Sequence, residues 1–182
     1  MKVTPLSIPD VLVIEPQIFE DTRGFFFESF REDIFKKETS LDISFVQDNH
    51  SKSFKGVLRG LHYQTLPYAQ GKLVRVIQGK ILDVAVDIRK SSPTFGKYVS
   101  QILSADNKKQ SWIPEGFAHG FLTLSDTSEV FYKTTEFYNS NSQQCIIWND
   151  QTLMIEWPEN LIIKLSEKDK LGKKFSEAIF FD

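Results

Sequence analysis

His62 stands in the run GVLRGLHYQ, residues 56–64, which otherwise has the composition of a β-strand. The chain has three histidines, and one with Arg59 and Gln64 close by is a candidate for proton transfer, because histidine titrates near neutral pH. In a regular strand His62 and Gln64 share one face and Arg59 lies on the other. Arg59 and His62 can therefore share a pocket only if the strand is irregular, and Gly60 is the position that tolerates a bulge.

A second histidine, His119, lies in IPEGFAHGF, residues 113–121, where proline and glycine form a turn that leads into a strand. A stable metal site needs about three or four protein ligands. A His-x-His pair is missing here, because His62 is followed by tyrosine and glutamine, and we expect His50 in a turn at a strand end. We therefore expect no catalytic metal and no other cofactor.

Two histidines, a lysine and a tyrosine around one pocket could move a proton beside a carbonyl group. A histidine held by a carboxylate is a general base near neutral pH, because the carboxylate fixes the tautomer and stabilises the imidazolium that forms. A lysine aimed at the carbonyl oxygen would stabilise the enolate. A tyrosine on the opposite side could return the proton, and these groups together would make an epimerase.

Short β-strands are expected to position these residues. In residues 72–89 apolar side chains recur at every second position on both sides of Gln78-Gly79-Lys80, which predicts a hairpin of two antiparallel strands. About ten strands with evenly spaced turns predict an all-β sandwich or barrel. Besides the hairpin, the predicted strands are 11–16, 24–30, 43–49, 56–64, 97–103, 118–124, 129–135 and 144–150.

Helices are expected at only two places. REDIFKKE, residues 31–38, has acidic residues first and lysines last, which suits the helix dipole. The charged tail SEKDKLGKKF, residues 166–175, also has helical character. By composition alone this tail is an ordinary solvated surface segment.

The bulk composition restricts the class of protein. A chain of 182 residues with 41% hydrophobic content predicts one domain, residues 1–182. A net charge of −2 gives no general attraction to nucleic acid or to membranes, so an anionic ligand needs a local cluster of cations. Cys145 is the one cysteine, which excludes an internal disulfide. With no hydrophobic leader and no long apolar span, we expect a cytoplasmic protein.

Taken in order, the motifs resemble those of the dTDP-4-dehydrorhamnose 3,5-epimerases, metal-free cupins that act on a sugar nucleotide. The resemblance runs from about residue 11 to residue 172 and implies a cupin jelly-roll fold with a few short helices. One such motif is weak evidence, but eight in order are strong. The motifs are DTRGFFFESF (21–30), QDNHSKS (47–53), GVLRGLHYQ (56–64), AQGKLVRVIQGKILDVAVDIRKSSPTFG (69–96), IPEGFAHGF (113–121), YKTTEFY (132–138), WND (148–150) and LSEKD (165–169).

The resemblance also implies residue roles. His62 would be the base that removes the proton next to the C4 keto group, and Asp169 the carboxylate paired with it. Lys72 would stabilise the enolate, and Tyr132 would donate a proton from the other face. Tyr138 would stack on the nucleotide base. The remaining positions that match nucleotide and diphosphate binding are Arg23, Glu28, Gln47, Asn49, Arg59, His119 and Lys168.

The implied reaction converts dTDP-4-dehydro-6-deoxyglucose to dTDP-4-dehydrorhamnose, by an isomerase that needs neither metal nor redox cofactor. Its product belongs to dTDP-rhamnose biosynthesis, which supplies carbohydrates such as lipopolysaccharide. The resemblance also implies a homodimer in which terminal strands cross between subunits. The apolar segment 11–16 would suit such pairing.

The chain departs from the family pattern at two positions. Gln143 stands where the family tends to have glutamate, and Gln151 where WNDP has proline. Gln143 keeps a hydrogen-bonding amide but loses a charge, which leaves the preference for base and sugar open. Four alternatives stay open: a 3-epimerase, a 3,4-ketoisomerase, a metal-dependent cupin oxygenase and a carbohydrate-binding cupin without activity.

Overall fold

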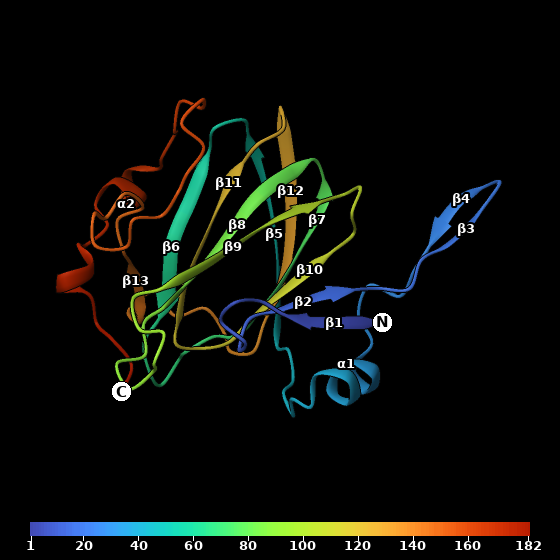
Figure 1. Cartoon of the computed structure of the whole chain (residues 1–182), viewed down its shortest axis with the longest axis horizontal. Helices are drawn as coiled ribbons and strands as arrows, with labels where there is room; N and C mark the ends of the chain where they lie inside the picture. The colour runs from blue at the N-terminus through green and yellow to red at the C-terminus, as the bar shows by residue number, and fades with distance from the viewer.

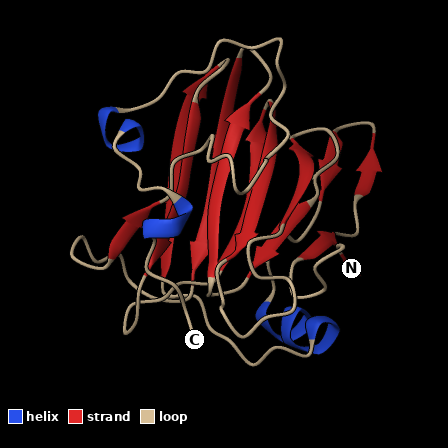
Figure 2. Ribbon diagram, turned by 60° about the vertical axis from the view of Figure 1, so that its left-hand side comes forward, coloured by secondary structure: helices blue, strands red, loops and turns tan.

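The strands of the computed structural model, which describes residues 1–182, form two facing sheets and a separate hairpin (Figures 1 and 2). One sheet has the order β1-β2-β10-β7-β12-β5, the other has the order β13-β6-β11-β8-β9, and β3 pairs with β4. This architecture confirms the all-β prediction. The bounds are β1 Lys2–Pro5, β2 Leu12–Glu15, β3 Phe19–Asp21, β4 Gly24–Phe26, β5 Gln47–Phe54, β6 Leu58–Gln64, β7 Lys72–Gln78, β8 Lys80–Asp87, β9 Tyr98–Ser104, β10 Gln110–Ile113, β11 Phe117–Thr123, β12 Thr127–Thr134 and β13 Gln143–Cys145.

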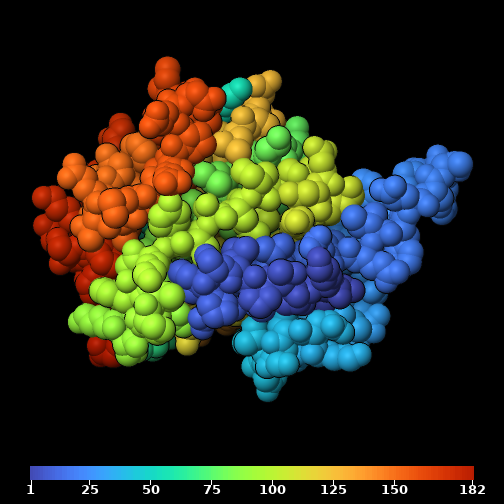
Figure 3. All heavy atoms as spheres, in the orientation of Figure 1, coloured from blue at the N-terminus to red at the C-terminus, as the bar shows by residue number.

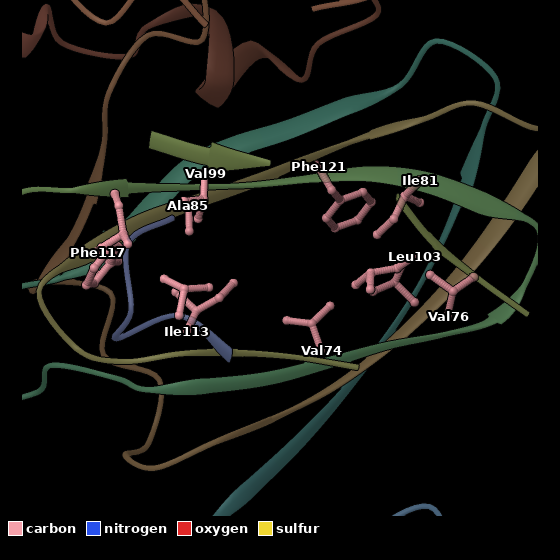
Figure 4. Packing of buried hydrophobic residues seen from close by; sticks show 12 residues of the cluster. Val74, Val76, Ile81, Ala85, Val99, Leu103, Ile113, Phe117 and Phe121 are labelled. Atoms are coloured by element: carbon pink, nitrogen blue, oxygen red, sulfur yellow. The ribbon is translucent and has the colours of Figure 1, made fainter. Parts of the chain in front are cut away.

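The main apolar core fills the space between the two sheets (Figure 4). Val74 and Val76 of β7 point into it from the six-stranded sheet, and Ile81 and Ala85 of β8 from the five-stranded sheet. Burying one such aliphatic side chain is worth about 1.5–3 kcal/mol. The layer therefore holds the two sheets together. Because both sheets line the polar cavity, it also holds the two walls of that cavity in place.

The C-terminal part of the chain packs against the outer face of the five-stranded sheet. It forms the left-hand side of the molecule in Figures 1 and 3. Val84 and Val86 of β8 are fully buried in a second cluster, together with Leu153 and Phe175. Both faces of β8 are thus covered, which explains its nearly continuous apolar sequence. Two aspartates interrupt it, Asp83 and Asp87. Asp83 lies on the inward face, between Ile81 and Ala85.

The hairpin predicted over residues 72–89 is wrong in its pairing. Both strands form, as β7 and β8, but β7 pairs with β10 and β12 whereas β8 pairs with β9 and β11. The chain crosses from one sheet to the other at Gly79, which has a φ of 77°. A Cβ there would lie 2.0 Å from the carbonyl oxygen of Thr127, so only glycine fits.

Other predicted strands differ from the structure in their bounds. The strands expected at 24–30 and 144–150 shorten to β4 and β13, and the one expected at 43–49 becomes β5. His50 therefore lies within a strand and not in a turn. Its Nε2 is 3.0 Å from Oε2 of Glu129 on β12, so an exposed cross-strand pair accounts for this histidine.

Helices occupy the two expected places. Helix α1 spans Glu32–Thr39, has acidic residues in its first turn and lysines in its last, and buries Phe35 in a small third cluster. Helix α2 spans Glu167–Lys170 and buries Asp169, which corrects the interpretation of this tail as a solvated surface segment. A single turn of 3-10 helix covers Phe175–Glu177. No helix has the length and apolarity needed to span a membrane.

The β3–β4 hairpin projects away from the two sheets as an arm (Figures 1 and 3). Phe19, Phe25 and Phe26 on this arm are 54%, 59% and 66% exposed. We expected the segment 11–16 to pair between subunits. Within the chain its strand, β2, already pairs with β1 on one side and with β10 on the other. The two edge strands of this sheet are β1 and β5, so β2 has no free edge within one chain.

Candidate active site

A cavity of about 250 Å³ opens at one end of the space between the two sheets. Strands of both sheets contribute to it, namely β5, β7 and β12 from one and β6, β11 and β13 from the other. Most of its lining is polar. The lining residues are Gln47, Asn49, Ser51, Arg59, His62, Tyr63, Gln64, Gln70, Lys72, His119, Phe121, Tyr132, Tyr138 and Gln143.

His62 is hydrogen bonded to Asp169, as the resemblance implies. Its Nε2 lies 2.5 Å from Oδ1 of Asp169, which is brought in by helix α2. Ser166 caps that helix, and its Oγ donates to the other carboxylate oxygen at 2.7 Å. Burial raises the pKa of Asp169, but hydrogen bonds from His62, Ser166 and the Gly60 amide outweigh it and hold the pKa below its usual value. Asp169 is therefore a carboxylate, so in a neutral imidazole at this position Nε2–H donates to it and the lone pair lies on Nδ1.

Arg59 lines the same cavity as His62 because strand β6 is irregular at Gly60. The pairing with β11 matches His119 with His62 but Phe121 with Arg59, so β6 holds one extra residue. Gly60 has a φ of 130°. A Cβ on it would lie 2.5 Å from Cα of Gly120 on β11. The bulge predicted at this position is therefore present.

Lys72 reaches into the cavity from the first position of β7. It is 8% exposed, and its Nζ donates to the carbonyl oxygen of His62 at 3.1 Å. Burial lowers the pKa of Lys72 to about 8, against the opposing charge of Asp83. This places an ammonium group beside the base, with two of its three N–H groups free for a ligand.

His119 forms a second buried pair with Asp83. Its Nε2 lies 2.7 Å from Oδ1 of Asp83, and the two side chains are 8% and 2% exposed. Burial lowers the pKa of His119, even though the charge and the hydrogen bond of Asp83 act in the other direction. The ring is held by its carboxylate partner while one edge lines the cavity.

Tyr132 enters the cavity from β12, in the sheet that faces His62. Burial raises the pKa of its hydroxyl, with a smaller opposing effect from the charge of Arg59. The hydroxyl therefore carries its proton at neutral pH. A base on one sheet, a proton donor on the other and a cation beside the base can remove and return a proton next to a carbonyl group.

Polar side chains from several elements surround the outer part of the cavity. Gln47 donates to Asn49 at 2.9 Å on β5, so these two share a face as expected. The hydroxyl of Tyr138 donates to Oε1 of Gln143 at 2.6 Å. Nζ of Lys168 donates to the same oxygen at 2.5 Å. Lys168 thus belongs to this group, although it does not itself line the cavity.

Arg23 and Glu28 are not brought to this cavity. Arg23 lies on the β3–β4 arm, where its side chain is 88% exposed and paired with Asp21. Glu28 lines a different pocket near helix α1 and pairs with Arg31. Within one chain, these two expected binding residues therefore stand apart from His62.

Asp83 and Ser51 belong to the surroundings of the site but were not recognised in the sequence. Asp83 interrupts the apolar run ILDVAVDI, and a buried carboxylate needs a partner, which was a readable signal. Ser51 follows Gln47 and Asn49 at the same period of two. Its Oγ is the one buried side-chain polar atom without a hydrogen-bond partner. Ser51 lines the cavity, and Asp83 lies behind it as the partner of His119.

The comparisons with known proteins agree over nearly the whole chain. The family model described as dTDP-4-dehydrorhamnose 3,5-epimerase matches residues 5–177. The dTDP-4-dehydrorhamnose 3,5-epimerase of Shigella flexneri is 58% identical over 181 residues, which cover 100% of this chain and 99% of that protein. The protein of the same name from Pseudomonas aeruginosa is 55% identical, with the same coverage.

Solved structures share the fold. The crystal structure of dTDP-6-deoxy-D-glucose-3,5-epimerase from Legionella pneumophila, in complex with dTDP-4-keto-L-rhamnose, has a TM-score of 0.95 and 47% identity, and covers 98% of this chain and 94% of that chain. The structure of a 3'-monoepimerase from Streptomyces bikiniensis, in complex with dTDP-quinovose, has a TM-score of 0.89 and 32% identity. The match covers 94% of this chain and 87% of that chain. The resemblance indicated by the motifs is confirmed, and the chain belongs to the dTDP-4-dehydrorhamnose 3,5-epimerase family.

Proposed function

We propose that this chain converts dTDP-4-dehydro-6-deoxyglucose to dTDP-4-dehydrorhamnose by inverting C5 and C3, the two carbons that flank the C4 ketone. The observation that carries this proposal is the placement of His62 and Tyr132 on facing sheets across one cavity. Inversion needs a proton to leave one face of a carbon and to arrive at the other. A base and an acid on opposite walls meet that need.

The proposed reaction uses three groups in one cycle. Nδ1 of His62 takes the proton from the carbon next to the ketone, and the electron pair of that C–H bond forms an enolate. The ammonium of Lys72 stabilises the enolate oxygen. Tyr132 then donates its proton to the opposite face and restores the ketone. Solvent returns a proton to Tyr132 and receives one from His62, and the cycle repeats at the second carbon after the sugar ring turns.

The nucleotide is proposed to lie toward the outer part of the cavity. Arg59 is held by Oγ of Ser53 at 3.0 Å and by the carbonyl oxygen of Lys52 at 3.1 Å, which orients its guanidinium for a diphosphate. Tyr138 is half exposed and can stack on the base. Oε1 of Gln143 accepts hydrogen bonds from Tyr138 and Lys168, as a carboxylate oxygen of glutamate could. We therefore propose that the change at this position leaves the preference for thymidine intact.

Hydrogen exchange tests the reaction directly. The purified protein is incubated with dTDP-4-dehydro-6-deoxyglucose in heavy water, and the product is analysed by NMR. We expect solvent deuterium at both C3 and C5, and the same rate in the presence of EDTA. Deuterium at C3 alone would favour the alternative of a 3-epimerase, for which the similarity to the Streptomyces bikiniensis 3'-monoepimerase is the supporting observation. Loss of activity with EDTA would contradict the mechanism.

We also propose that the chain works as a homodimer. The arm of β3 and β4 exposes three phenylalanines and carries Arg23, and neither Arg23 nor Glu28 reaches the cavity of its own chain. A second copy that packs against the arm would cover this apolar surface. It would also place Arg23 near a neighbouring cavity, where its charge could bind the diphosphate.

Mixing of two inactive variants tests this arrangement. Arg23→Ala and His62→Ala are each expected to lose activity as pure proteins. A mixed dimer has one site with both defects and one site with neither, so mixing after partial unfolding and refolding should restore activity. As controls, each variant is partially unfolded and refolded alone. A monomer in light scattering, or no restoration in a sample shown to contain mixed dimers, would contradict the proposal.

The setting of the reaction follows from its substrates. We propose that the protein acts in the cytoplasm, where nucleotide sugars are made, and that its product enters dTDP-rhamnose biosynthesis for carbohydrates such as lipopolysaccharide.

A further inference from the structure

The thiol of Cys145 lies beside the His62–Asp169 pair and has no part in the proposed reaction. Cys145 on β13 is directly opposite His62 on β6 in the antiparallel ladder, so the two side chains lie on the same face. Its Sγ is 4.0 Å from Oδ1 of Asp169. The imidazole nitrogen, the thiol sulfur and the carboxylate oxygen all lie within 4.8 Å of one another.

These donors suit a thiophilic divalent cation such as zinc. Zinc binds nitrogen, oxygen and sulfur at about 2.0–2.3 Å in a tetrahedron, which places its ligand atoms roughly 3.3–3.8 Å apart. The distance between Sγ of Cys145 and Oδ1 of Asp169 is already 4.0 Å. The 2.5 Å hydrogen bond between His62 and Asp169 must open by roughly 0.8 Å to reach that spacing.

The surroundings of the thiol suit a cation. A disulfide within the chain is excluded, because no second cysteine exists. The carboxylate of Asp169 attracts a divalent cation, and the side chain of His62 is 27% exposed, so the cluster is accessible to solvent ions.

We propose that His62, Cys145 and Asp169 form an inhibitory site for a thiophilic divalent cation, with zinc as its ligand. Binding releases the thiol proton to solvent and breaks the hydrogen bond between His62 and Asp169. The metal occupies Nε2 of His62, so the single ring proton moves to Nδ1. That nitrogen then has no lone pair to accept the substrate proton. The inhibition rests on the proposed role of His62, whereas the binding itself does not.

Cobalt(II) is the probe for binding, because a thiolate bound to it gives an intense charge-transfer band in the near ultraviolet. Titration of the folded protein with cobalt should produce this band, and zinc should displace it. Cys145→Ala is expected to lose the band and to keep the metal-free turnover, since the thiol has no catalytic role. A protein without the band, or a band that survives in Cys145→Ala, would overturn the site.

Inhibition is measured on the same samples by deuterium incorporation with added zinc. We expect reversible inhibition of the unmodified protein that EDTA removes. The half-inhibitory zinc concentration should be at least about tenfold higher for Cys145→Ala, because even the loss of a residue that only supports a metal ligand costs about 10–100-fold in affinity. Cys145→Ser keeps nearly the size of the side chain and removes the sulfur. It should therefore lose the cobalt band and the sensitivity to zinc as the alanine variant does, which separates loss of the ligand from a change in packing. A cobalt band with full turnover at saturating zinc would overturn the inhibitory role and leave the metal site in place.

Discussion

Replacement of either member of the His62–Asp169 pair should lower kcat by about 10²–10⁴-fold, because this is the range that general-base catalysis contributes. In His62→Asn the group that accepts the proton is gone. In Asp169→Asn the amide keeps the size of the carboxylate and can present either its carbonyl oxygen or its N–H groups to Nε2, so it no longer fixes the tautomer of the ring, and the imidazolium loses its counter-charge. Single-turnover rates measured by deuterium incorporation give the size of the effect.

His50→Ala is the matched control for this prediction. His50 is also a histidine in a strand, but it is exposed, pairs with Glu129 and does not line the cavity. The His50→Ala variant should turn over substrate at the rate of the unmodified protein. Circular dichroism verifies that each variant keeps its sheets. Near-normal turnover of a folded His62→Asn or Asp169→Asn variant would mean that another residue is the base.

Lys72→Met should lower kcat by about 10²–10³-fold, the usual cost of removing one donor from a developing oxyanion. Methionine keeps the length of the side chain and removes its charge, and its burial costs little in this cavity. Lys80→Met is the control, since Lys80 is exposed at the start of β8. KM should change less than kcat, because the enolate oxygen carries its charge only during the reaction. A change confined to KM would instead assign Lys72 to substrate binding.

The pH dependence provides a second readout for Lys72. Burial lowers the pKa of Lys72 to about 8, so the ammonium is present below that value and is lost as the pH rises through it. Turnover that needs the ammonium should therefore decline above about pH 8. In Lys72→Arg the guanidinium stays charged, and this decline should disappear from whatever activity remains. A decline that persists unchanged in Lys72→Arg would assign it to another group.

Much of the site could be read from local patterns along the sequence. The resemblance named His62, Asp169, Lys72 and Tyr132, and the structure brings all four to one cavity or directly behind it. Their catalytic roles stay predictions until the variants are measured. The bulge at Gly60 was also predictable, because alternation in a strand separates Arg59 from His62 unless one residue is added.

Other features of the fold and the site could not be predicted from local patterns. The two strands of residues 72–89 have the expected period, but a period of two gives the face of each side chain and not the strand that pairs with it. The pairing was decided by β9, β10, β11 and β12, which lie further along the chain. For the same reason Asp83 could be seen as an acidic residue in an apolar run, but its contact with His119 depends on the pairing of β8 with β11.

Local patterns along the chain predicted most of the β-strands, the kinds of chemical groups and the family, because alternation, residue type and motif order are properties of neighbouring positions. Which of these groups meet was set by the tertiary structure. It joins His62 to Asp169 across 107 positions, lowers the pKa of Lys72 by burying it, and leaves Arg23 on an arm outside the cavity of its own chain. Burial and hydrogen bonding depend on segments that are distant in the chain, and the packed sheets bring those segments together.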